Sequence, residues 1–161
     1  MKMTRVLTLV GALLAAMPLV STAAPAAPAA PVKAARGSCA LQAAGAWVRL
    51  PPVAMPMLAG FVRLHNPCAS TITVLGARSD AFGDVSLHES TRVDGISRMR
   101  PVARLPVPPG AQVELQPGGL HLMLRHPRGK LEPDGSVDVV LELEGGGTRA
   151  VLFEVRAAGS R

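Results

Sequence analysis

The chain has 161 residues, 17 basic and 11 acidic side chains, and a formal net charge of +6 at pH 7. It contains no tyrosine and one tryptophan, and its basic residues are scattered rather than clustered. Nucleic-acid binding usually combines clustered Lys and Arg with stacking aromatic side chains, so this composition disfavours that class of partner. A mildly basic surface remains compatible with an acidic protein partner.

The first 23 residues have the layout of a secretory signal peptide. Lys2 and Arg5 form a basic start, residues 6–20 are apolar, and small residues follow. The apolar stretch is shorter than the roughly 20 residues that a membrane-spanning helix needs. We therefore expect export with cleavage near Ala23 and no direct insertion into the membrane. Loss of the two basic residues leaves 15 basic and 11 acidic side chains, an excess of +4.

Residues 24–37 are dominated by Ala and Pro and lack the large apolar side chains that offset the entropy cost of ordering. We expect this segment to be a flexible tether. Residues 38–157 are long enough for one domain with a hydrophobic core, and residues 158–161 form a short C-terminal tail.

The two cysteines, Cys39 and Cys68, lie at the start of this domain. Two thiols in an exported domain most often form a structural disulfide, which we expect here. Closing a loop of this length would stabilise the fold by roughly 3.5 kcal/mol in the chain-entropy model. A metal or redox role, or two unpaired buried thiols, are the alternatives.

Short alternating apolar segments recur through the domain, as in "AWVRL" (46–50), "DVSLH" (84–88) and "VDVVLELE" (137–144). Gly/Pro-rich turns such as "QPGG" (116–119) and "EPDG" (132–135) separate many of them. Many short strands between such turns are typical of an antiparallel β-sandwich or barrel. The sequence therefore predicts an all-β fold.

The segment "GGLHLML", residues 118–124, combines an imidazole and a thioether in one predicted strand. Successive side chains of a strand point to opposite faces, so His121 and Met123 share one face and the three leucines share the other. The leucine face is expected in the core. A single His or Met is most often a structural residue, but chance explains their pairing less well when both lie on one strand face.

Two more candidate ligands precede this strand at fixed distances. Ten residues separate His88 from Met99 and 21 separate Met99 from His121, which gives the pattern H-x10-M-x21-H-x-M. Thioethers are soft neutral donors that favour Cu(I), and imidazole also suits copper. Because the four donors are neutral, the second charge of Cu(II) would have no compensating anion, so we expect the reduced ion. A blue-copper electron carrier would need a cysteine thiolate, and both cysteines precede the motif.

This spacing resembles the copper-binding motif of the PCu(A)C-type periplasmic copper chaperones. The similarity extends to "AWVR" (46–49), "LHES" (87–90), "DGISRMRPV" (94–102) and "QPGGLHLML" (116–124). The resemblance implies a periplasmic protein with a cupredoxin-like β-barrel, and delivery of one Cu(I) per chain to the copper centres of respiratory cytochrome c oxidase. It also implies four metal ligands, which are His88, Met99, His121 and Met123.

The expected partner is the copper-accepting domain of a membrane-bound cytochrome oxidase or another periplasmic copper carrier, and the chain is expected to be a monomer. The alternatives are a periplasmic copper sequestration or tolerance protein and a metal-free secreted β-sandwich interaction module. The sequence shows no nucleophile elbow, paired-carboxylate pattern or phosphate-binding loop, so we do not expect an enzyme.

Four further residues are weaker candidates. Met55 and Met57 lie in a proline-rich segment and are candidates for auxiliary soft ligands or partner contacts, with loop packing as the alternative. Arg98 and Arg100 flank Met99 and, in an extended segment, point away from the ligand face. They are candidates for a basic rim that docks an acidic acceptor, with ordinary solvated arginines as the alternative.

Overall fold

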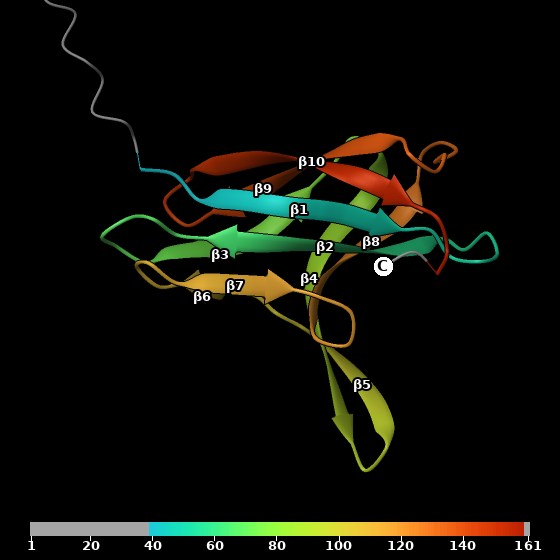
Figure 1. The fold of residues 1–161 in the computed structure, drawn as a ribbon, viewed down its shortest axis with the longest axis horizontal. Helices are drawn as coiled ribbons and strands as arrows, with labels where there is room; N and C mark the ends of the chain where they lie inside the picture. Colours follow the sequence, from blue (N-terminus) through green and yellow to red (C-terminus); the bar gives the residue numbers. More distant parts are fainter. Residues whose placement is uncertain (1–38, 160–161) are drawn as a thin grey trace, which may run out of the picture. The chain divides into compact units, whose positions relative to one another are not determined.

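The computed structural model describes residues 39–159, so the predicted signal peptide and tether lie outside the described residues. Ten strands make up the regular structure of this part of the chain (Figure 1). Within it, no helix is long and apolar enough to cross a membrane. The strands are β1 (Gln42–Arg49), β2 (Met57–His65), β3 (Ile72–Arg78), β4 (Phe82–Val93), β5 (Ile96–Pro101), β6 (Leu105–Val107), β7 (Gln112–Leu115), β8 (Leu120–Pro127), β9 (Ser136–Leu143) and β10 (Thr148–Arg156).

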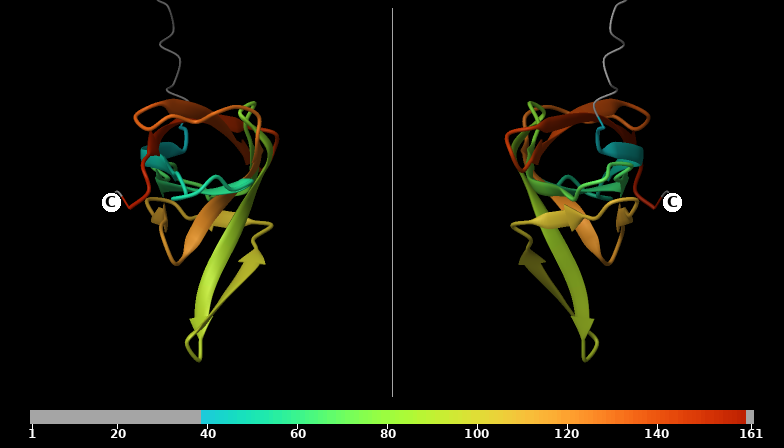
Figure 2. Two further views of the ribbon diagram at one scale, coloured as in Figure 1. Left: turned by 90° about the vertical axis from the view of Figure 1, so that its right-hand side faces the viewer. Right: turned by 90° about the vertical axis from the view of Figure 1, so that its left-hand side faces the viewer.

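Seven strands form a closed barrel in the order β4-β8-β2-β1-β10-β9-β3, and a β3–β4 pairing closes the ring. Figure 2 shows this ring from its ends. The predicted all-β barrel is confirmed. One pairing, β1 with β10, is parallel. Alternation along a strand specifies which side chains are buried but not the direction of the neighbouring strand, so the sequence pattern did not indicate it.

The predicted leucine face of β8 lies in the core. Leu122 and Leu124 are completely buried, and Leu120 at the strand's start is half-buried. Gly60 of β2 packs against this face: a Cβ atom there would lie 3.0 Å from Leu124 Cδ1 and 3.4 Å from Leu122 Cβ. The absence of a side chain at this position lets β2 approach β8 closely.

The predicted disulfide is confirmed, because Cys39 and Cys68 are bonded with Cα atoms 5.5 Å apart. Beside it, the side chain of Asn66 is fully buried and its hydrogen-bonding groups are used. Its Nδ2 donates to the carbonyls of Ser70 and Val107, and its Oδ1 accepts from the backbone N–H of Cys68. These bonds hold the turn that carries the second cysteine.

The hairpin of β4 and β5 extends beyond the barrel (Figures 1 and 2). Its turn, Asp94–Gly95, has φ angles of 52° and 79°, as the two central residues of a tight hairpin turn require. Among the described residues β5 pairs with β4 alone, and all six of its residues are exposed. Met99 therefore lies on an exposed edge strand.

Candidate metal centre

Strand register brings the two predicted histidine ligands together. His88 of β4 lies directly opposite His121 of β8 in their antiparallel pairing. Directly opposed residues of such a pair place their side chains on the same face. The two rings have centroids 6.1 Å apart and planes inclined by 34°. Their proximity is a property of the β4–β8 pairing, since 33 positions separate them in the sequence.

The same register places the two methionines on this face. Met123 lies opposite Ser86, and Met99 lies opposite Ser90. The two serines are each two residues from His88, so their side chains point to the same side of β4. All four predicted ligands therefore share one face of the β5-β4-β8 sheet, which is the face opposite the buried leucines.

Three of the four residues line one cavity of about 310 Å³, namely Met99, His121 and Met123. His88 lies outside its lining, beside His121 on the neighbouring strand. The four differ sharply in access to solvent: His121 is 6% exposed, whereas Met99 is 53% exposed. The lining of the cavity thus includes both a buried imidazole and an accessible thioether.

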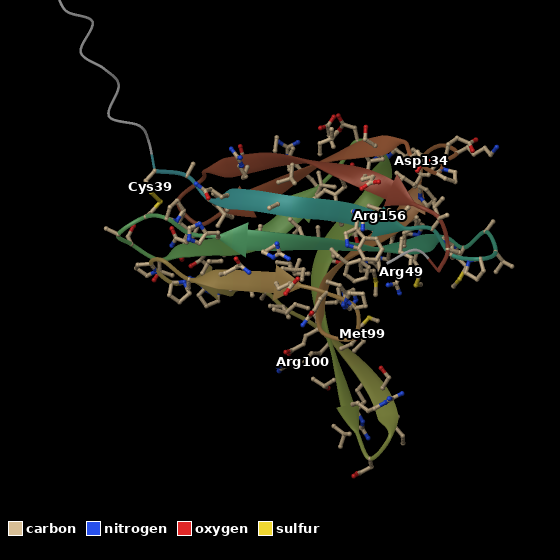
Figure 3. The ribbon with its side chains drawn as sticks, viewed as in Figure 1. Cys39, Arg49, Met99, Arg100, Asp134 and Arg156 are labelled. Carbon is tan, nitrogen blue, oxygen red and sulfur yellow. A yellow bond between two sulfur atoms is a disulfide. The ribbon has the colours of Figure 1, made fainter. Side chains whose placement is uncertain are left out.

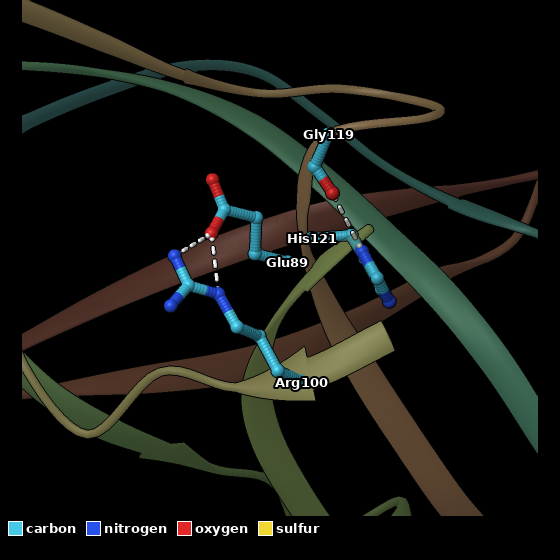
Figure 4. A network of polar contacts seen from close by, with 4 residues as sticks. All are labelled: Glu89, Arg100, Gly119 and His121. Atoms are coloured by element: carbon cyan, nitrogen blue, oxygen red, sulfur yellow. Dashed lines mark hydrogen bonds and ion pairs between the residues drawn. The ribbon is translucent and has the colours of Figure 1, made fainter. Parts of the chain in front are cut away.

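The ring of His121 is oriented by the backbone. Its Nδ1 lies 3.0 Å from the carbonyl oxygen of Gly119 (Figure 4). In the tautomer in which Nδ1–H donates to this carbonyl, Nε2 carries the lone pair that binds a metal. This carbonyl belongs to the "QPGG" turn, which directly precedes β8. The turn therefore orients the His121 ring in addition to connecting to the strand.

The ring of His88 has an unsatisfied nitrogen. Its Nε2 lies 3.2 Å from Ser86 Oγ, while its buried Nδ1 has no hydrogen-bond partner. Burial, reinforced by the positive charges of His121 and Arg125 and opposed by Asp84, lowers the pKa of His88 below its ordinary value of 6.5. The neutral imidazole, which is the form that ligates metals, is therefore favoured.

The donor chemistry of the described residues points to a soft metal. They contain no group of three or more His, Cys, Asp or Glu side chains able to hold a metal ion, and both cysteines are in the disulfide. A metal on this face would therefore combine imidazole nitrogens with thioether sulfurs, a set that suits Cu(I) better than zinc or calcium.

Arg49 is a cavity-lining residue that sequence reasoning missed. Its guanidinium lies 5.1 Å from the ring centroid of Trp47 and 5.3 Å from that of Phe61, and its Nε is buried without a hydrogen-bond partner. The guanidinium thus stacks on two aromatic rings that line a neighbouring cavity, and Arg49 contributes to the lining of both cavities. The sequence feature that could have pointed to Arg49 is its position in "AWVR", two residues after the single tryptophan.

The two arginines beside Met99 point away from the ligand face, as the extended segment predicts. Arg98 lies opposite Thr91 and Arg100 opposite Glu89. Figure 3 shows Met99 and Arg100 on opposite sides of β5. Arg100 Nη2 lies 2.6 Å from Glu89 Oε2, so its charge is neutralised within the hairpin (Figure 4). Arg98 has no such ion pair among the described residues.

The two candidate auxiliary methionines are in different surroundings. Met57 lines the same cavity as Met99, His121 and Met123. Met55 lines another cavity together with residues near the β8–β9 connection. Their spacing in the sequence did not distinguish them.

Comparison with solved structures defines the class of protein. The apo PCuAC domain from PmoF1 superimposes with a TM-score of 0.61 at 19% identity, covering 73% of this chain and 93% of that one. The solution structure of CuI-DR1885 from Deinococcus radiodurans has a TM-score of 0.57 at 26% identity, covering 70% and 75%. The cupredoxin-like fold and the PCu(A)C-type resemblance are therefore confirmed.

The family follows from the sequence comparisons. The family model described as "Putative lipoprotein LpqE-like" matches residues 41–155, and the chain belongs to this LpqE-like family. A relative from Leifsonia xyli subsp. xyli, described as "Putative lipoprotein Lxx21020", is 32% identical over 117 residues, which are 72% of this chain and 69% of that protein.

Proposed function

We propose that this protein is an exported copper carrier that binds one Cu(I) per chain and delivers it to the copper centres of a membrane-bound cytochrome c oxidase. The proposed ligands are His88, Met99, His121 and Met123. The observation that carries the proposal is the strand register, which places these two imidazoles and two thioethers on one face of three adjacent strands.

The charge of the site supports Cu(I) over Cu(II). Two neutral imidazoles and two thioethers supply no negative charge to offset the second charge of Cu(II). A divalent ion would therefore be destabilised relative to a monovalent one. Copper binding by relatives supports the same conclusion, since one of the similar structures is described as CuI-DR1885.

Two observations support export, with the periplasm as the proposed destination. The Cys39–Cys68 disulfide is of a kind that persists in oxidising compartments. The Leifsonia relative and the family are both described as lipoproteins, a class of exported protein. The signal-like sequence of residues 1–23 agrees with both.

The exposure of Met99 favours delivery over sequestration. A ligand on an exposed edge strand can detach from the ion and be replaced by a ligand from an acceptor protein. A storage site would be expected to enclose the ion on all sides. The acceptor is therefore proposed to contact the Met99 side of the cavity.

A Cu(I) competition titration against a chromogenic chelator tests the binding proposal. The wild-type chain should form a tight one-to-one complex, and the Met99→Ala, Met123→Ala double variant should lose it. Met55→Ala, which removes a thioether outside the cavity, is the matched control and should bind as the wild type does. Absence of wild-type binding, or equal binding by the double variant, would refute the proposed site.

Deletion of the gene separates delivery from sequestration. Delivery predicts loss of oxidase activity that added copper restores. Sequestration predicts intact oxidase activity with increased sensitivity to copper, and that result would overturn the delivery proposal while leaving the binding site in place.

A further inference from the structure

Met57 adds a third thioether to the lining of the cavity that Met99, His121 and Met123 share. Ala59 lies directly opposite Met123 in the β2–β8 pairing, and Met57 precedes it by two residues. The side chain of Met57 therefore starts from the same face of the sheet as Met123. It also lines the cavity formed by Met99, His121 and Met123. The motif H-x10-M-x21-H-x-M does not include it.

The surroundings of Met57 suit a movable ligand better than a core residue. The side chain is 43% exposed, so it does not fill the barrel interior. Its backbone is fixed in the first position of β2, opposite Arg125 of β8. Methionine has three rotatable bonds and a polarisable sulfur, so the thioether can move while the Cα atom stays in place.

We infer that Met57 is a transfer ligand, which binds Cu(I) transiently through its Sδ atom while the ion enters or leaves the site. This inference rests on the proposed function. One Cu–S bond forms to Met57 as the bond to Met99 breaks, and the reverse exchange restores the resting site. The ion stays Cu(I) throughout, and no proton moves because thioethers are neutral. Met57 thereby keeps the ion bound while a ligand of the donor or acceptor replaces Met99.

Met55 offers a matched control in the same segment. It is 46% exposed, close to the value for Met57. It lines a neighbouring cavity that shares Leu50, Pro51 and Leu58 with the cavity of Met57 but contains none of the proposed copper ligands. The two methionines are equivalent in chemistry and exposure and differ in the cavity they line. A role that depends on lining the cavity of Met99, His121 and Met123 is therefore expected of Met57 and not of Met55.

The first test compares Met57→Leu with Met55→Leu in the full chain. Leucine removes the sulfur and keeps an apolar side chain of similar volume. Cu(I) transfer from the loaded protein to excess chelator is followed by stopped flow. Met57→Leu should slow transfer about tenfold while equilibrium affinity stays within about threefold, and Met55→Leu should match the wild type. A wild-type transfer rate for Met57→Leu would overturn the inference. A loss of equilibrium affinity of about a hundredfold would also overturn it, because Met57 would then be a permanent ligand.

The second test observes the thioethers directly. With ¹³C-labelled methionine methyl groups assigned by single substitutions, sub-stoichiometric Cu(I) should shift or broaden the Met57 resonance and leave the Met55 resonance unchanged. If Met99 and Met123 respond and Met57 does not, the transfer role is wrong and the proposed function stands. If none of the cavity methionines responds, the proposed function itself fails.

Discussion

The two outer strands of the proposed site, β8 and β5, differ in how firmly they are held. β8 lies between β4 and β2 in the closed barrel, and its His121 is buried with a ring oriented by the Gly119 carbonyl. β5 pairs with β4 alone among the described residues, and its Met99 is more than half exposed. The site thus combines a rigid side that fixes geometry with an accessible side where ligands can be exchanged.

The physical basis of this difference is the number of neighbours of each strand. A strand paired on both sides opens only when the barrel opens, whereas an edge hairpin with few buried contacts opens locally at lower cost. Affinity should therefore depend most on β8 and exchange rate most on β5.

The largest expected effect separates these two roles directly. His121→Ala should lower Cu(I) affinity more than about a hundredfold, because loss of even an outer partner of a metal ligand costs about 10–100-fold. Met99→Leu should lower affinity less and accelerate release of Cu(I) to a chelator. Competition titration and stopped-flow release measure the two quantities. Equal losses of affinity in both variants would contradict the division of roles.

Protonation is expected to weaken binding through the histidines. A proton occupies the same nitrogen lone pair as Cu(I), so affinity is greatest above the histidine pKa values and falls as pH is lowered through them. Burial lowers the pKa of His88. The loss of Cu(I) affinity caused by protonation of His88 between pH 7.5 and 5 should therefore be smaller than the roughly thirtyfold loss expected for a histidine with an ordinary pKa. Titrations across this range measure it. Constant affinity would contradict a two-histidine site, and an NMR midpoint of His88 above 6.5 would contradict the lowered pKa.

Gly60→Val should perturb β8 from its core-facing side, opposite the proposed ligands. The new side chain would meet Leu122 and Leu124, whose strand also carries His121 and Met123. Overpacking of this kind costs about 1–3 kcal/mol, and thermal or urea unfolding of the variant measures it. Gly129→Val adds the same group where nothing lies within 4 Å and serves as the control. Unchanged stability of Gly60→Val would show that β2 and β8 can separate without cost.

The smallest expected effect concerns the exposed hairpin. Glu89→Gln removes the partner of Arg100 and should change stability by no more than about 1 kcal/mol, because both groups remain partly solvated. Cu(I) affinity should be unchanged, since the pair lies on the face opposite the ligands. If Arg98 and Arg100 form the docking rim considered from the sequence, transfer to an acidic acceptor should quicken at low salt in Glu89→Gln and slow in Arg98→Glu. Equal transfer rates for both variants and the wild type would contradict docking through these arginines.

The sequence by itself determined the fold class and a compact list of candidate ligands. Alternation of apolar residues is a local property, so it revealed the strands and the two faces of residues 118–124. The spacing of His88, Met99, His121 and Met123 carried the family resemblance, and the cysteine count with the export signal predicted the disulfide.

Only the tertiary structure decided how these residues meet. Which strands pair, and in which register, depends on long-range contacts that no local pattern encodes. The fold set His88 opposite His121, and it placed Met57 and Arg49, but not Met55, in the lining of the cavity that contains His121. It also closed the barrel with a parallel β1–β10 pair. The candidate ligands could therefore be identified from the sequence. Their shared face, their unequal burial and the third thioether arise from the packing of strands that are distant in the chain.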